Sequence, residues 1–483
     1  MNVHTKPTLR SHFVGGAWVE PLDPTPHEVA NPATGVTIAT IAFGGVADVD
    51  RAVAAAREAF ETWRLTTVAE RADLLRRIRD AYLARRDEFA LATTREMGVP
   101  ITKSREAQAP CGDEHLLSTI EALEAHAFER PSPRGGSTLR DEPVGVCGLI
   151  TPWNWPVNQV IVKVAPALAA GCTAVLKPAE LSPLSAILLA EVIEAADCPP
   201  GVFNLVQGDG PIVGNAIAAH EGIDMVSFTG STRAGAAVAA AAAPMVKRVA
   251  LELGGKSPNV LFADADIEAA VAFSVDTCFS NSGQDCDAPS RLLVERPVYD
   301  RVVELAAERA NATRVGDPMV EGDHLGPVVS MRQWQNIQRM IEAGIAEGAR
   351  LVAGGPGRPD GLSDHLREGP FVRPTVFADV SNDMRIAREE VFGPVLAIIP
   401  FEDEAEAVRI ANDTPYGLAA FVQTGDAERA QRVARLIRAG TVSINGNAYD
   451  YDVPFGGFKR SGYGRENGAY GLHDYLDVKA ITG

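Results

Sequence analysis

The residues around Cys286 suit this cysteine to chemistry rather than to packing. It lies in the segment FSNSGQDCDAPSR, where Ser282 and Gly283 favour a turn and Asp285 and Asp287 flank the cysteine. Most cysteines in buried strands are inert, but polar neighbours on both sides make an apolar core implausible here. A thiol on a loop that solvent reaches can act as a nucleophile.

The sequence leaves open the charge state of this thiol. An ordinary cysteine pKa of about 8.5 leaves a few per cent of thiolate at neutral pH, so the surroundings would have to activate it. Asp285 and Asp287 would oppose thiolate formation if they lie close, because like charges repel. The spacing alone does not say which influence is larger.

Two further residues are candidates to assist such a nucleophile. Glu252 ends the apolar run in RVALELGGKSP, and a carboxylate at the exit of a parallel strand faces the crevice where such sheets bind ligands. Burial would raise its pKa and suit it to general-base catalysis, whereas a cap or an ion pair is an equal alternative. Asn154 lies between two prolines in TPWNWP, so its amide is a rigid donor for an oxyanion, although an Asn in a turn is more often structural.

A cofactor signal comes from the segment SFTGSTRAGAAV, which is typical of a strand, a turn and a helix. Gly230 and Gly235 would let a phosphate approach the backbone, and the helix N-terminus offers free N–H groups to an anion. Lys177 and Glu180, in AVLKPAE, follow another strand at the same sheet edge, where they could bracket a ribose. Two charges after a strand are otherwise simply solvated.

The elements that must position these residues alternate along the chain. After Pro143 come VGVCGLI, TAVLKP, FNLVQG, MVSFTG and RVALELGG, and residues 256–441 hold a second series with RLLV, VLAIIPF and TVSIN. Such alternation with helical stretches indicates βαβ units and parallel sheets that are buried on both faces. We expect two α/β domains that join near Gly254 and Gly255.

Three other segments carry simpler predictions. Amphipathic spacing over residues 46–91 predicts two surface helices. The polar stretch over residues 130–143 predicts a linker or an exposed hairpin. The alanine run over residues 234–243 predicts a closely packed helix that Pro244 ends.

Composition excludes several classes of protein. The chain has 483 residues and a formal net charge of −18, which argues against nucleic acid and anionic membranes as partners. It shows neither a transmembrane span nor the apolar segment of a signal peptide. Six scattered cysteines without a Cys-x-x-Cys pair indicate reduced thiols in the cytoplasm, and the dispersed histidines predict no metal site.

Seven motifs together resemble one known family. NSGQDC, LELGGKSP, PWNWP, LKPAE, FTGS, EEVFGPV and PFGGFKRSG all occur in the chain. On these motifs the sequence resembles the aldehyde dehydrogenase superfamily, over essentially all 483 residues. The resemblance implies oxidation of an aldehyde substrate to a carboxylic acid, with a nicotinamide cofactor and a thioester intermediate.

The resemblance also implies catalytic roles. Cys286 would be the nucleophile, Glu252 the base that activates water, and Asn154 an oxyanion donor together with the Cys286 backbone N–H. Glu390 and Phe392, in EEVFGPV, would position the nicotinamide ribose and ring.

For the rest of the cofactor the resemblance implies a second set of residues. Lys177 and Glu180 would hold the adenosine ribose, Gly230 and Ser231 would lie against the pyrophosphate, and Trp153 would line the cleft. Because Glu180 would repel a 2′-phosphate, NAD is the expected cofactor, although some relatives with this glutamate also accept NADP.

The family's architecture gives expected domain limits. It implies two parallel-sheet α/β domains, Rossmann-like and catalytic, with a small β oligomerisation arm. The expected ranges are 1–122 with 142–253 for the NAD-binding domain, 254–445 for the catalytic domain, and 123–141 with 446–483 for the arm and tail. Relatives form homodimers or homotetramers.

Two other activities fit the same fold. Relatives that pass the acyl group to coenzyme A commonly lack the base glutamate, so Glu252 favours hydrolysis. A member that binds NAD without catalysis is the third reading, and the presence of both Cys286 and Glu252 argues against it.

The substrate itself is indicated only weakly. In the stretch GNAYDYDVPFGG, Tyr449 and Tyr451 join Trp155 in suggesting an aromatic or bulky aldehyde, unless these rings merely pack the loop. Acids on both sides of the nucleophile depart from the commonest family pattern, and they either tune the thiol or disfavour strongly anionic aldehydes.

Overall fold

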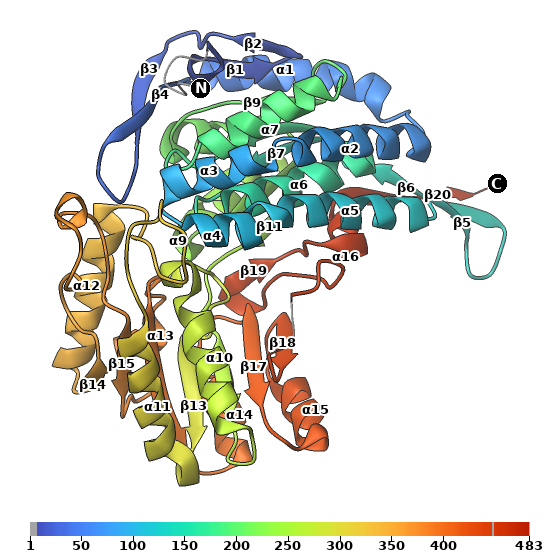
Figure 1. The fold of residues 1–483 in the computed structure, drawn as a ribbon. Helices are drawn as coiled ribbons and strands as arrows, with labels where there is room; N and C mark the ends of the chain where they lie inside the picture. The colour runs from blue at the N-terminus through green and yellow to red at the C-terminus, as the bar shows by residue number, and fades with distance from the viewer. Residues whose placement is uncertain (1–6, 447–448, 483) are drawn as a thin grey trace.

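Two sheets, each covered by helices on both faces, divide the chain into two lobes, and a small β arm projects from one of them (Figure 1). The structure, a computed structural model, describes residues 7–446 and 449–482. Residues 1–6, 447–448 and 483, which belong to the expected domain ranges, lie outside the described residues. Within the described ranges, none of the helices combines the length and the apolar character that a membrane crossing would need.

The first sheet has eight strands in the order β19-β11-β10-β7-β8-β9-β1-β2. From β11 to β9 the neighbours are parallel, whereas β1, β2 and β19 add antiparallel edges. The strands are β1 (His12–Val14), β2 (Ala17–Val19), β7 (Val146–Ile150), β8 (Thr173–Lys177), β9 (Phe203–Leu205), β10 (Met225–Thr229), β11 (Arg248–Glu252) and β19 (Gly462–Tyr463). The central strands β7, β8 and β10 are buried throughout, which is why they are largely apolar in sequence.

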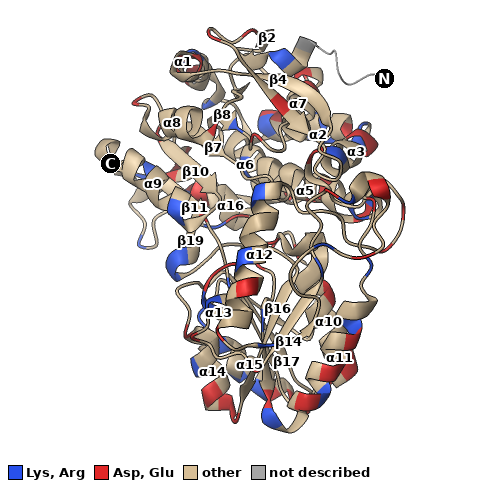
Figure 2. Ribbon diagram, turned by 90° about the vertical axis from the view of Figure 1, so that its left-hand side faces the viewer, with Lys and Arg blue, Asp and Glu red and all other residues tan. Residues whose placement is uncertain are grey.

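Helices cover both faces of this sheet. One hydrophobic cluster packs the sheet against α2 (Val68–Leu83), α3 (Arg86–Met97), α5 (Pro110–Ala125), α6 (Pro156–Ala170) and α7 (Leu184–Ala195). Another packs the opposite face against α1 (Val46–Trp63), α8 (Asn215–Ala219) and α9 (Thr232–Ala242). The short helix α4 (Ile101–Lys103) follows α3. Figure 2 shows charges on outer helices such as α11 and α14, whereas the strands next to α6 carry few.

Two helix predictions need correction. Residues 46–91 hold parts of three helices, not two, because α2 and α3 are separated at Arg85, which leaves the helical conformation and pairs with Glu88 and Glu191 at 2.8 Å each. The amphipathic pattern continues across this break, so periodicity alone could not reveal it. The alanine run does form helix α9, but many of its alanines are exposed rather than closely packed.

The second sheet has seven strands in the order β14-β15-β16-β13-β12-β17-β18, all parallel to their neighbours except the edge strand β14. Helices α10 and α11 cover one face, and α12 to α15 pack on the other. The strands are β12 (Pro258–Leu261), β13 (Arg291–Glu295), β14 (Arg350–Ala353), β15 (Thr375–Ala378), β16 (Val395–Phe401), β17 (Ala419–Gln423) and β18 (Thr441–Ile444). The helices are α10 (Ile267–Phe279), α11 (Tyr299–Ala312), α12 (Met331–Ala346), α13 (Arg385–Arg388), α14 (Glu404–Asn412) and α15 (Ala427–Leu436).

The arm is a three-stranded antiparallel sheet. Strands β5 (Glu129–Pro131) and β6 (Ser137–Pro143) form a hairpin, so the hairpin reading of residues 130–143 is confirmed. Strand β20 (Leu476–Thr482) pairs with β6 over its whole length, after helix α16 (Gly468–Asp474). A separate hairpin of β3 (Thr25–Ala30) and β4 (Thr37–Phe43) lies near the N-terminus.

A buried guanidinium ties the second lobe together just behind the nucleophile segment. Arg291 is fully buried at the start of β13. It donates to the carbonyls of Lys256, Ile410 and Ala411 at 3.0 Å each, and to Asn382 Oδ1 at 2.9 Å. Burial lowers its pKa to about 10, yet it stays charged at neutral pH. These bonds fix the strand that follows Cys286.

We predict that Arg291→Leu lowers the free energy of unfolding by at least about 3 kcal/mol, because several buried acceptors lose their donor at once. Urea unfolding followed by tryptophan fluorescence measures the shift. The control is Arg309→Leu, which removes an exposed ion pair with Asp276 and should cost less than about 1 kcal/mol. Equal effects of the two changes would contradict this role for Arg291.

Candidate active site

The nucleophile segment has an unusual backbone. Asn281, Ser282 and Gly283 have φ values of 55°, 57° and 72°, so three consecutive residues are left-handed just before Cys286. Such conformations cost free energy for residues other than glycine and persist only where surrounding contacts impose them. Here Ser282 Oγ donates to the Gly326 carbonyl at 2.9 Å, and Gln284 Oε1 accepts from the Val329 N–H at 2.9 Å. These contacts hold the loop in its strained form.

The thiol of Cys286 is half-buried, and its surroundings are acidic. Burial raises its pKa well above the ordinary value, and the charges of Asp287 and Asp285 raise it further. Glu390 and Glu252 act in the same direction. The question that the sequence left open is therefore answered: the aspartates oppose the thiolate.

The two aspartates differ in their contacts. Asp285 Oδ1 accepts a hydrogen bond from Trp155 Nε1 and another from Asn281 Nδ2 at 3.1 Å. Burial raises its pKa to about 7, and the neighbouring Asp287 adds to the shift. The pKa of Asp287 is also raised by burial. Both carboxyl groups thus lie in a setting that penalises negative charge.

Glu252 stands at the end of β11 with its carboxylate buried. Neither oxygen has a hydrogen-bond partner among the described residues. Burial raises its pKa well above the ordinary range, and Glu466 raises it further, although Lys163 and Arg465 partly offset this. Glu252 can take this position only because residue 456 is a glycine: a Cβ there would lie 2.7 Å from Glu252 Oε1, closer than real contacts allow. An unpartnered buried carboxyl of this kind is suited to accept a proton from a reacting water.

Asn154 is fixed in the loop between β7 and α6. Its side-chain N–H donates to the Gln284 carbonyl at 3.0 Å, and its own carbonyl accepts from Asn281 Nδ2 at 3.0 Å. These bonds tie the loop of Asn154 to the loop of Cys286, although the two are remote in sequence. The second amide hydrogen of Asn154 remains available as a donor in the cleft that Asn154 and Cys286 both line.

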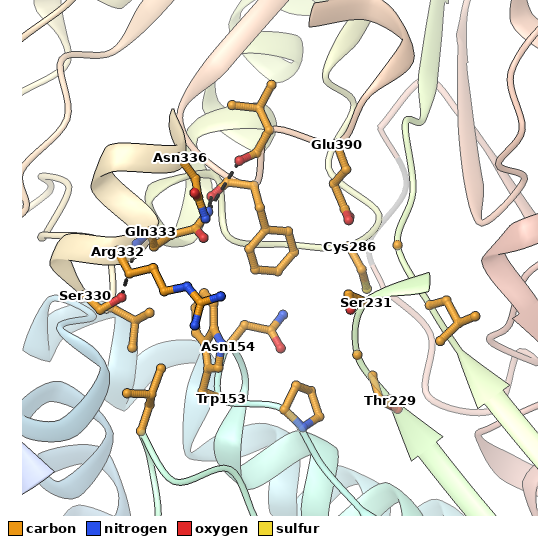
Figure 3. A pocket seen from close by; sticks show the side chains of 18 of the residues that line it. Trp153, Asn154, Thr229, Ser231, Cys286, Ser330, Arg332, Gln333, Asn336 and Glu390 are labelled. Atoms are coloured by element: carbon orange, nitrogen blue, oxygen red, sulfur yellow. Dashed lines mark hydrogen bonds between the residues drawn. The ribbon is translucent and has the colours of Figure 1, made fainter. Parts of the chain in front are cut away.

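One cleft of about 730 Å³ brings these groups together. Nine of the residues with a predicted catalytic or cofactor role line it, namely Trp153, Asn154, Glu180, Gly230, Ser231, Glu252, Cys286, Glu390 and Phe392. Lys177 and Gly235 do not. A Cβ at Gly235 would lie 2.5 Å from Leu253 Cδ2, so this glycine lets helix α9 pack closely and does not face the cleft. Figure 3 shows Glu390, Cys286 and Ser231 along one wall and Ser330, Arg332 and Gln333 along the other. Trp153 and Asn154 lie between the walls (Figure 3).

Lys177 lies just behind the cleft rather than in it. Its ammonium is buried and donates to the Pro178 carbonyl at 2.7 Å and to Glu180 Oε2 at 3.2 Å. Burial lowers its pKa, while Glu180 partly counteracts the shift. Lys177 therefore orients Glu180, which does reach the cleft.

The turn between β10 and α9 presents a helix N-terminus to the cleft. Ser231 caps the helix by accepting from the Ala234 N–H at 3.3 Å, and Gly230 and Ser231 face the cleft. The first N–H groups of a helix have no partner within it, and the helix dipole adds partial positive charge. A phosphate group fits this end of the cleft.

Glu390 and Phe392 form the opposite end. Glu390 Oε1 accepts from the Gly255 N–H at 3.0 Å, and burial raises the pKa of Glu390 to about 7. A Cβ at Gly254 would lie 2.2 Å from Glu390 Oε2, so only a glycine at this position lets the Glu390 carboxyl come so close to the backbone. The ring of Phe392 meets Trp153 edge-on, with centroids 5.4 Å apart.

Sequence reasoning missed the wall that helix α12 supplies. Arg332 and Gln333 line the cleft, and the side chain of Arg332 extends toward Trp153 and Asn154 (Figure 3). Among the described residues Arg332 has neither an ion pair nor a side-chain hydrogen bond. An arginine on the polar face of an amphipathic helix looks like ordinary surface charge, so only its place beside the cleft reveals it.

No metal centre emerges from residues 7–446 and 449–482, where no three His, Cys, Asp or Glu side chains gather as ligands. Tyr449 and Tyr451 stack edge-on at 4.9 Å, and Trp155 binds Asp285, so these aromatics do pack against neighbours. Asn447 and Ala448 of the same stretch lie outside the described residues.

The raised pKa of Cys286 gives a direct prediction. Alkylation of this thiol by iodoacetamide should rise about tenfold per pH unit from pH 7 to 9, because only the thiolate reacts. Asp287→Asn should lower the thiol pKa and speed the reaction severalfold at neutral pH, whereas Glu180→Gln, at a distance in the same cleft, should not. Mass spectrometry of the Cys286 peptide measures the rate, and a pH-independent rate would refute the assignment.

Comparison with known proteins gives a consistent picture. The profile described as "Aldehyde dehydrogenase family" matches residues 18–481. A 3-succinoylsemialdehyde-pyridine dehydrogenase from a Pseudomonas species is 50% identical over 475 residues, which is 98% of each chain.

Solved structures agree. Aldehyde dehydrogenase C of Pseudomonas syringae, an alanine-for-cysteine variant crystallised with NAD+ and octanal, is 51% identical with a TM-score of 0.97, covering 100% of this chain and 99% of the other. A betaine aldehyde dehydrogenase from Staphylococcus aureus with NAD+ is 38% identical with a TM-score of 0.95, covering 99% and 97%. The chain belongs to the aldehyde dehydrogenase family.

Proposed function

We propose that this protein oxidises an aldehyde to a carboxylic acid with NAD as the cofactor, through a thioester on Cys286. The observation that carries the proposal is the convergence of a thiol, an unpartnered carboxyl and a fixed amide on one cleft, although they come from three remote segments. The same cleft ends at a helix N-terminus suited to phosphate. Relatives crystallised with NAD+ have the same fold.

The first step is attack by the Cys286 sulfur on the aldehyde carbon. The carbonyl oxygen gains negative charge, which the amide of Asn154 and the backbone N–H of Cys286 stabilise. Each such donor is worth about 3 kcal/mol or more in a site that excludes water. The thiol proton must leave as the bond forms, and the raised pKa of the thiol makes this step faster at alkaline pH.

The second step leaves the acyl group on sulfur. The nicotinamide, when bound, supplies the acceptor for the hydride that the thiohemiacetal carbon loses. Glu252 then takes a proton from water as the water oxygen attacks the thioester, and the carboxylic acid leaves as Cys286 regains its proton. Because the pKa of Glu252 is raised, this residue must first be deprotonated, which also favours alkaline pH.

Two substitutions separate these steps. Cys286→Ala should abolish formation of reduced cofactor, because no thiohemiacetal can form. Glu252→Gln should give at most one equivalent of reduced cofactor per site, since the thioester accumulates. Stopped-flow absorbance measures both. The control is Cys198→Ala, which removes a half-buried thiol outside the cleft and should leave turnover normal. Steady turnover in Cys286→Ala would rule out the mechanism.

Several features of the cleft fit a dinucleotide. Glu180, held by Lys177, would accept hydrogen bonds from the adenosine ribose. Gly230 and Ser231 would meet the pyrophosphate, with Trp153 beside it and the unpaired guanidinium of Arg332 facing them across the cleft. At the other end Glu390 and Phe392 would hold the nicotinamide riboside.

The charge of Glu180 predicts the choice of cofactor. NADP should bind about tenfold or more weakly than NAD, because its 2′-phosphate would meet this carboxylate. Glu180→Gln should bring the dissociation constants of NADP and NAD closer together. Glu389→Gln is the matched control, since Glu389 lines the same cleft but pairs with Arg385. Quenching of protein fluorescence measures binding, and an unchanged ratio in Glu180→Gln would count against this role.

The surface of the chain supports assembly into a homodimer or homotetramer. Strand β20 is an edge strand whose residues after Leu476 are all exposed, and such edges are normally covered. Helix α9 also exposes alanines, and Val246 just beyond it is 90% exposed. A second copy of the chain would bury both surfaces.

We also propose the remaining assignments as a set. The eight-stranded sheet forms the NAD-binding domain, the seven-stranded sheet the catalytic domain, and the three-stranded sheet the oligomerisation arm. All six cysteines are free, which fits a reducing cytoplasm. The buried, unpartnered Glu252 supports hydrolysis rather than acyl transfer to coenzyme A.

A further inference from the structure

The charges around the nucleophile are all of one sign. Asp287, Asp285, Glu390 and Glu252 are the groups whose charges act on the thiol of Cys286, and each is a carboxyl. Within the described ranges neither Asp285 nor Asp287 forms an ion pair within 4.0 Å. An aldehyde that reaches the sulfur must therefore pass close to carboxyl groups that lack a counterion.

Two of the cations near these carboxyl groups are engaged by other groups, and the third acts weakly. Lys163 pairs with Glu466. Arg465 donates to the carbonyls of Gly457 at 3.1 Å and Gly464 at 2.6 Å. Lys103 acts on Asp285 more weakly than burial, Asp287 or the two hydrogen bonds that Asp285 accepts. Lys163 and Arg465 are therefore not free to receive a carboxylate carried by a substrate, and Lys103 offsets the acidic surroundings of the thiol only in part.

Asp287 is the carboxylate free to meet a substrate. Asp285 accepts from both Trp155 and Asn281, which engage its Oδ1. Asp287 accepts no side-chain hydrogen bond from the described residues, it is half-buried, and its charge reaches both the thiol and the hydroxyl of Tyr449. It directly follows the reacting residue in the chain, and the ring of Tyr449, on which its charge also acts, belongs to an aromatic rim.

The rings of that rim are neutral. Tyr449 and Tyr451 meet edge-on at 4.9 Å, and His115 meets Tyr451 edge-on at 4.9 Å. Burial lowers the pKa of His115 to about 4, so its ring is neutral at working pH, and it contacts Asn158 rather than an acid. Aromatic faces beside a carboxylate attract cations.

The cofactor cleft lies on one side of the Cys286 sulfur, and Asp287 does not line it. Trp153, Glu390 and Phe392 line that cleft, whereas Trp155, Asp285, Asp287 and the tyrosines do not. When the cofactor fills this cleft, the aldehyde must approach the sulfur from the side on which Asp287 lies.

On this geometry we propose that Asp287 selects substrates by charge, favouring aldehydes whose far end is cationic or neutral and rejecting those that carry a carboxylate. The proposal rests on the aldehyde oxidation proposed above and names its substrate class. Asp287 acts here as a specificity-determining residue through direct contact with the substrate.

Three aldehydes of matched length test it: propanal bearing a terminal trimethylammonium group, its tert-butyl isostere, and propanal bearing a terminal carboxylate. We expect kcat/KM to fall in that order, by roughly tenfold between the cationic and the anionic aldehyde or more. Because Asp287→Asn also changes the reactivity of the thiol, each rate is divided by that of the tert-butyl isostere in the same variant. On this relative scale Asp287→Asn should raise kcat/KM for the anionic aldehyde severalfold and lower it for the cationic one.

The control is Asp450→Asn, which removes an equal charge from an exposed position near the same tyrosines and should preserve the order. Turnover of the tert-butyl isostere shows that each variant is folded and active. If none of the three aldehydes reduces the cofactor, the proposed oxidation itself fails. If all are oxidised but Asp287→Asn leaves the cation-to-anion ratio unchanged, the oxidation stands and the role of Asp287 is overturned.

Discussion

The constraint that the rest of the structure must satisfy is the burial of several carboxyl groups beside one thiol. Glu252, Asp285, Asp287 and Glu390 all have raised pKa values, and burial is the main cause in each case. Such acids bind their protons more tightly in the folded protein than in the unfolded chain. As the pH rises from about 4 toward 7, the unfolded chain releases these protons first, so this cluster lowers the stability of the fold at neutral pH. The surrounding sheets and the buried Arg291 must offset that cost.

Close approach of backbone to side chain is what makes the cluster geometrically feasible. A Cβ at Gly254 would collide with Glu390, one at Gly456 with Glu252, and one at Gly255 would lie 2.3 Å from the Cys286 carbonyl. The glycines of the LELGGKSP and PFGG motifs therefore leave room for the Glu390 and Glu252 carboxyl groups and for the Cys286 backbone, although the two motifs are far apart in the chain. Left-handed backbone at Asn281 and Ser282 adds a second local cost at the same place. Local strain and charge burial coincide where chemistry is expected, as in other active sites.

Much of this could be predicted from the sequence, and the failures have physical reasons. Strands such as β7 and β8 are buried on both faces, so their unbroken apolar runs made the parallel sheets readable. Glu252 and Asn154 were identifiable by residue type and by the ends of the strands they follow, and Cys286 by its polar neighbours on a loop, and the three do share a cleft. Their roles and the domain limits stay predictions. The break at Arg85 was invisible because periodicity continued across it, and Arg332 was missed because nothing in its own neighbourhood distinguishes a cleft wall from open surface.

The pairing of β19 with β11 has a consequence for how the protein matures. Glu252 lies opposite Gly462 in this pair, and Leu251 lies opposite Tyr463, so the strand that carries the carboxyl pairs with a segment that follows the whole second lobe in the chain. On the ribosome the first sheet must wait with that edge open while the whole second lobe is synthesised. A nascent chain can thus bury most of the first lobe yet lack the strand beside Glu252 until residues 462–463 emerge, which couples assembly of the site to synthesis of the second lobe.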